Sequence, residues 1–88
     1  MKINLTEIEI RPSLSAKPEK VNMKDIVAEA VYQSATDYQT HVLAHRIGES
    51  DGEMDISPVE AAAIKRAVAG FKFYAQMPIL KALGEKFD

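Results

Sequence analysis

The stretch from Glu49 to Glu60 reads E-S-D-G-E-M-D-I-S-P-V-E and gathers carboxylates around one glycine. When a twelve-residue EF-hand calcium loop is aligned to begin at Glu49, acidic or hydroxyl side chains fall on coordinating positions of the loop. These side chains belong to Glu49, Asp51, Glu53, Ser57 and Glu60. However, the sixth position of such a loop must turn sharply and is ordinarily glycine, whereas here it is Met54. The carboxylates would then not converge on one ion.

The same stretch has a simpler interpretation as a turn followed by the start of a helix. Asp51-Gly52 favours a turn, and S57-P-V-E60 combines a capping serine, a proline in the first turn and a glutamate that closes a capping box. Acidic side chains near a helix N-terminus are also stabilised by the helix dipole. We therefore interpret the stretch as architectural and keep its four aligned carboxylates as secondary candidates for a metal site.

The other residues suited to metal chemistry are His41 and His45, in the sequence H-V-L-A-H. Imidazoles four residues apart lie on one side of a helix and can hold zinc or nickel together, as in metalloprotease helices. Here the general-base glutamate after the first histidine is absent, and no third ligand is evident. We expect two surface histidines, with the pair as a secondary candidate metal site.

No other pattern indicates catalysis. The sequence contains no cysteine and no G-x-S-x-G motif, and its four glycines are scattered rather than grouped in a phosphate-binding loop. Carboxylates are paired only in the acidic stretch, where exposure would leave them untuned for proton transfer. We therefore expect a non-enzymatic protein that uses no cofactor.

Length and charge restrict the class of protein further. Eighty-eight residues form a single small domain spanning 1–88. A net charge of −2 argues against a general nucleic-acid binder, because such proteins carry a basic footprint. The basic C-terminal third nevertheless keeps a small regulatory protein that contacts nucleic acid or a host enzyme as an alternative. Its candidate contacts are Lys65, Arg66 and Lys72, beside Phe71 and Phe73.

The absence of cysteine, of a signal peptide and of a membrane-spanning apolar run predicts a cytoplasmic protein without membrane contact.

The elements that must position these residues indicate an α+β, mostly helical fold. Apolar residues alternate as Ile3 and Leu5 and then as Ile8 and Ile10, which predicts an N-terminal strand over 2–10 with a bulge or turn near Thr6-Glu7. Two prolines predict that residues 11–21 form an irregular connector. We expect the strand over 2–10 to pair with a strand over 53–56, and helices to pack against this ribbon.

Three to four helices follow from the periodicity, at about 23–34, 37–47, 58–69 and 71–83. Asn22 is the predicted N-cap of the first, and Thr36 with Gln39 forms a predicted capping box for the second. A single kinked helix across 23–47 stays open, because no glycine or proline interrupts it. The predicted buried face of the third helix consists of Val59, Ala63, Ile64, Ala67 and Val68. Pro78 either starts a new helix or kinks the last one.

The last helical segment is too apolar for one buried face. At 100° per residue its large side chains surround most of the axis, which is typical of a helix that is central in a core or shared with a partner. The predicted interaction residues are Phe71, Phe73, Met77, Leu80 and Leu83. We expect them to mediate protein–protein contacts, either self-association or binding to a larger partner.

The order of these features also resembles a group of known proteins. The segments K-P-E-K-V-N-M-K-D, L-A-H-R-I, D-G-E-M-D-I-S-P-V-E-A-A-A-I-K-R-A-V and I-L-K-A-L lie within residues 17–84. This arrangement of acidic turn, helix cap and apolar terminal helix is similar to small phage- and prophage-encoded proteins of unassigned function. The resemblance implies a phage or mobile-element context and no particular activity. A metal-responsive module, using the acidic stretch or the histidine pair, is the third functional hypothesis.

Overall fold

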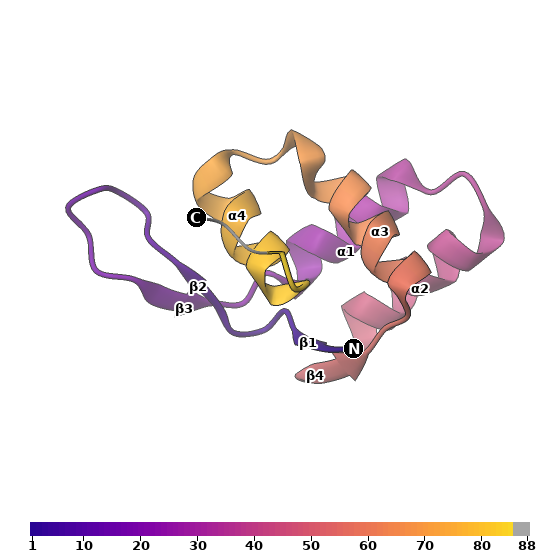
Figure 1. Cartoon of the computed structure of the whole chain (residues 1–88). Helices are drawn as coiled ribbons and strands as arrows, with labels where there is room; N and C mark the ends of the chain where they lie inside the picture. Colours follow the sequence, from indigo (N-terminus) through magenta and orange to yellow (C-terminus); the bar gives the residue numbers. More distant parts are fainter. Residues whose placement is uncertain (86–88) are drawn as a thin grey trace.

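The computed structural model describes residues 1–85 and shows an α+β fold in which two short antiparallel ribbons flank a group of helices (Figure 1). The strands are β1 (Lys2–Asn4), β2 (Ile8–Ile10), β3 (Glu19–Val21) and β4 (Glu53–Asp55). The helices are α1 (Lys24–Ser34), α2 (Tyr38–Glu49), α3 (Pro58–Ala67), the 3-10 turn η1 (Val68–Gly70) and α4 (Phe73–Ala82). The predicted fold class and the four helical regions are confirmed.

The first ribbon pairs the N-terminus with the segment before α3. β1 and β4 run antiparallel, with Ile3 opposite Met54, so the predicted pairing of these regions is confirmed. The backbone N–H of Ile56 donates to the Met1 carbonyl at 2.8 Å, and the Met1 amine donates to the Ile56 carbonyl at 3.0 Å. The buried side chains of Ile3 and Ile56 anchor the ribbon to the core.

The turn predicted near Thr6-Glu7 is present at residues 5–7, and it divides the expected strand over 2–10 into β1 and β2, of which only β1 pairs with β4. Asn4 stabilises this turn by accepting hydrogen bonds from the backbone N–H and the hydroxyl of Thr6. After the turn, β2 pairs with β3 and forms a second ribbon, so residues 11–21 are not wholly irregular. The two prolines lie in the loop before β3 and not in the paired residues, which is where proline is tolerated. The resulting hairpin projects from the helices (Figure 1).

α1 and α2 are separate helices, so the alternative of one kinked helix is wrong. Ala35 has an extended backbone (φ −67°, ψ 128°) and ends α1, and Asp37 is extended as well (φ −140°, ψ 164°). Asp37 is the N-cap of α2 and accepts from the Thr40 N–H at 2.7 Å, so the predicted capping box at Thr36 is wrong by one residue. Before α1, the Asn22 side chain accepts from the Lys24 N–H at 3.1 Å.

α3 begins with the predicted capping box, in which Ser57 accepts from the Glu60 N–H and Glu60 accepts from the Ser57 N–H. α4 continues through Pro78, which lacks the N–H that would otherwise bond to the Tyr74 carbonyl. Gly84 ends α4 with φ +91°, and hydrogen bonds from Gly84 and Glu85 to the carbonyls of Lys81 and Leu80 form a Schellman motif. Glu85 then pairs with Lys65 at 2.7 Å and ties this end of α4 to α3.

The core lies between the helices and the inner faces of both ribbons, and its buried residues among 1–85 are all apolar. α1 packs against α2 and α3, and α4 packs against β2. The largest fully buried side chains are Leu5, Val27, Val31, Leu43, Ile47, Ile64, Val68 and Ile79. Val59, which was expected in this core, lies in the first turn of α3 and is 72% exposed. Within residues 1–85, every helix is too short and too polar to cross a lipid bilayer.

Candidate interaction surface

A groove of about 770 Å³ lies between the β2–β3 hairpin and α4, and we call it the hairpin groove. Its apolar lining includes Leu14 of the hairpin loop and Phe73, Tyr74 and Met77 of α4. Leu14 is 94% exposed and Phe73 is 73% exposed. Large apolar side chains that gather in one exposed hollow are typical of protein contact sites. Two separate elements, the projecting hairpin and the last helix, therefore build this surface.

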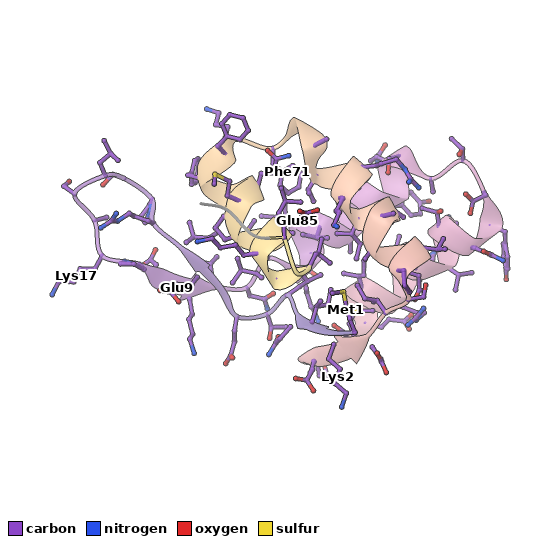
Figure 2. The ribbon with its side chains drawn as sticks, viewed as in Figure 1. Met1, Lys2, Glu9, Lys17, Phe71 and Glu85 are labelled. Carbon is purple, nitrogen blue, oxygen red and sulfur yellow. The ribbon has the colours of Figure 1, made fainter. Side chains whose placement is uncertain are left out.

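The five predicted interaction residues divide into three groups. Phe73 and Met77 are exposed and line the hairpin groove. Leu80 is half-buried against the core, and Leu83 is buried in it, so Leu83 is not available to a partner. Phe71, labelled in Figure 2, is half-buried and packs against the core. It lines a second hollow of about 460 Å³, which the exposed Ile26 also lines.

Sequence reasoning missed Leu14 and Tyr74 as members of the surface. Leu14 lies in R-P-S-L-S, where an isolated apolar residue near a proline in a loop was the available signal. Its position next to α4 depends on the β2–β3 pairing, which was not predicted. The hairpin also carries charged side chains that point into solvent, such as Glu9 and Lys17 (Figure 2).

The carboxylates of the acidic stretch lie in separate contacts. No cluster of three or more candidate metal-binding side chains exists among residues 1–85. Glu53 lies 3.8 Å from Lys2, whereas Glu60 pairs with Arg46 and closes the capping box of α3. Glu49 and Asp51 are exposed. The carboxylates therefore serve different contacts, in agreement with the architectural interpretation.

Two carboxylates of the helix caps have a lowered pKa. For Asp37 the main causes are the hydrogen bonds that it accepts from the backbone N–H and the hydroxyl of Thr40. For Glu60, partial burial raises the pKa, but the Ser57 N–H and the Arg46 guanidinium outweigh it and leave the pKa below its ordinary value. Both groups are thus ionised at neutral pH, which suits caps and not proton donors.

The two histidines lie together on α2, as the spacing predicted. Their Nε2 atoms are 3.2 Å apart, and their ring centroids are 4.8 Å apart. The Tyr32 ring of α1 contacts both, with centroid distances of 5.3 Å to His41 and 6.0 Å to His45. His45 is exposed and His41 is half-buried, so the pair is accessible from solvent.

The basic residues of the C-terminal third are partly engaged within the chain. Lys65 pairs with Glu85, and Phe71 packs against the core. Two of the five candidate contacts for nucleic acid are therefore already used by the fold. Arg66 belongs to a different hollow of about 840 Å³ between α2 and α3, together with the exposed Tyr38 and Val59.

Comparison with known proteins gives no match: no protein-family model fits the chain, no curated sequence is similar to it, and no solved structure resembles its fold.

Proposed function

We propose that the chain is a non-enzymatic protein-interaction module that self-associates through the hairpin groove. The observation that carries the proposal is the exposure of Leu14, Phe73, Tyr74 and Met77 around one hollow. Exposed apolar area of this kind costs free energy in water, and its burial against a matching surface recovers about 25 cal/mol per Å². Other large apolar side chains are exposed as well, such as Tyr38 and Val59, but the hairpin groove gathers four of them around one hollow.

Charge supports a second copy of the chain as the occupant. The groove is lined by the acidic Glu7 and by the basic Arg11 and Lys81. A two-fold symmetric contact places the same patch on both subunits, so the patch must complement itself. A patch of mixed sign meets this condition, whereas a patch of one sign would repel its copy. The apolar Leu14 at the hairpin loop supplies a projecting side chain that the groove of another copy can receive.

The non-enzymatic part of the proposal is supported by how the carboxylates are used. Glu60 is held ionised by its capping and ion-pair contacts, and Asp37 by its bonds to Thr40. A general acid at neutral pH needs the opposite shift, toward a raised pKa. These groups stabilise helix ends and have no free role in proton transfer.

The proposed setting is the cytoplasm of a cell that carries a phage or prophage. It rests on the resemblance to small phage-encoded proteins and on the absence of cysteine from the sequence. Flanking genes for capsid, tail or replication proteins would support this setting, and a neighbourhood of unrelated housekeeping genes would contradict it.

Sedimentation velocity over a range of concentrations tests the self-association. We expect the wild-type protein to shift from monomer to dimer, and Phe73→Ser to shift the dimerisation constant toward monomer. Val59→Ser is the matched control, because Val59 is 72% exposed and lies on α3 away from the groove. A wild-type protein that stays monomeric at millimolar concentration would overturn self-association and leave a larger partner as the occupant. Equal effects of the two variants would show that the groove is not the contact.

A further inference from the structure

The histidine pair is a second feature of the surface, separate from the hairpin groove. His41 and His45 are the two histidines of the chain, and their Nε2 atoms face each other at 3.2 Å. Without an ion, this contact requires one Nε2–H to donate to the lone pair of the other Nε2. A metal ion can take the place of that proton, because two unprotonated Nε2 atoms this close together can both bind one ion.

We propose that His41 and His45 form a bidentate site for a divalent late transition ion such as Zn²⁺, Ni²⁺ or Cu²⁺. An ion bound at about 2.05 Å from each nitrogen forms a triangle on the 3.2 Å base, with an N–metal–N angle of about 100°. This angle lies between the values of octahedral and tetrahedral coordination. Imidazole is a ligand that suits these ions, whereas calcium and magnesium prefer oxygen ligands.

The surrounding residues hold the pair in this arrangement. α2 places the two imidazoles one turn apart on the same side, and the Tyr32 ring of α1 contacts both of them. α1 packs closely on α2, so Tyr32 limits the rotamers that the imidazoles can adopt. Tyr32 is therefore a positioning residue for the site.

The site leaves coordination positions open to water or to an added ligand. Among residues 1–85, no third histidine, aspartate or glutamate joins the pair. Acidic side chains lie in the adjoining hollow of about 490 Å³, including Asp25, Glu29 and Glu49, and they favour the approach of a cation. The site is distant in sequence and in structure from the residues of the hairpin groove, so it does not depend on the proposed self-association.

Isothermal titration of the full chain with Zn²⁺ and with Ni²⁺ tests the site. We expect one ion per chain and simultaneous changes in both histidine ring signals in NMR spectra at one equivalent. The matched control is the double variant Gln39→His with His41→Gln, because it keeps two histidines but separates them by six residues. Both this variant and His45→Gln should bind Zn²⁺ and Ni²⁺ about tenfold more weakly than the wild type, because a second imidazole of the same chain no longer reaches the ion.

Two results would overturn the proposal. If the double variant matches the wild-type affinity for the ion, or if two ions bind independently with one histidine each, the pair is not a chelate. Far-UV circular dichroism and the metal-free unfolding midpoint establish that each variant is folded. Tyr32→Phe keeps the ring that contacts the imidazoles and should retain binding, whereas Tyr32→Ala should weaken it while the fold persists.

Discussion

Replacing Glu60 by alanine removes a carboxylate that connects the start of α3 to the end of α2. Oε1 accepts from the Ser57 N–H at 2.8 Å, and Oε2 pairs with the Arg46 guanidinium. Arg46 also donates from Nη2 to the Asp55 carbonyl at 2.9 Å, so it links α2, β4 and α3. The substitution therefore releases the reciprocal half of the capping box and one side of this link.

The expected loss of stability follows from these two contacts. An unsatisfied N–H at the helix start costs about 1 kcal/mol, and a partly exposed ion pair adds about 0.2–1 kcal/mol. The Glu60 side chain is 25% exposed, so screening reduces the ion-pair contribution only in part. The sum is about 1.5 kcal/mol, which lowers the unfolding midpoint of a domain of this size by about 6–12 °C.

Thermal unfolding followed by circular dichroism measures this loss. Glu60→Gln keeps a hydrogen-bond acceptor but removes the charge, so its midpoint should lie between those of wild type and Glu60→Ala. Glu53→Ala is the control, because the Glu53 side chain is 63% exposed and lies 3.8 Å from Lys2. Its effect should stay within about 0.5 kcal/mol. An unfolding midpoint that is unchanged in Glu60→Ala would show that these contacts do not stabilise the start of α3. If millimolar calcium raised the unfolding midpoint of the wild type but not that of Glu60→Ala, the calcium-loop interpretation would be restored.

Three further outcomes are expected. The lowered folded-state pKa values of Asp37 and Glu60 contribute stability above their ordinary values of 3.8 and 4.5, and this stability is lost as pH falls through the folded-state values. Urea midpoints from pH 6 to pH 2 should therefore drop below about pH 4.5, with a smaller drop in Glu60→Gln; parallel curves would contradict this assignment. Gly84→Ala should lower the free energy of unfolding by about 1–2 kcal/mol, because φ at this position is +91° and the added Cβ would lie 3.3 Å from Met1 Cε. Gly52→Ala is the control, because its added Cβ would lie in open space. Leu83→Ala should lower the free energy of unfolding, measured by urea denaturation, by about 2–4 kcal/mol, because Leu83 is 3% exposed. Phe73→Ala should lower it by less than about 0.5 kcal/mol, because Phe73 is 73% exposed. Equal losses would contradict this difference in burial.

Much of the secondary structure was predictable because it depends on neighbouring residues. The Ser57–Glu60 capping box and the helical regions follow from local chemistry and periodicity. The pairing of residues near Ile3 with those near Met54 is not local, but the alternation of apolar residues in each segment indicated that both are strands. Asp37 was missed as a cap because Thr36 offered an equally suitable side chain one residue earlier. Choosing between them depends on which residue the backbone leaves extended.

The candidate surface was predictable only in part. The excess of apolar residues in α4 indicated that some of them would be exposed, and Phe73 and Met77 are. The same pattern could not tell that Phe73 is exposed and Leu83 is buried, because in a helix that is apolar on nearly all sides the buried face cannot be identified from the sequence. Packing of β2 against α4 made that distinction.

By itself, the sequence determined the capped start of α3 and the histidine spacing, and it favoured a turn over a calcium loop in the acidic stretch, where Met54 occupies the place that needs glycine. These features depend on residues within a few positions of one another. Only the tertiary structure decided that Glu19–Val21 pairs with Ile8–Ile10 and brings Leu14 beside α4. It also decided that Tyr32 packs on the histidine pair. Such contacts join segments that are distant in the chain, and their free energy comes from burial that no local pattern encodes.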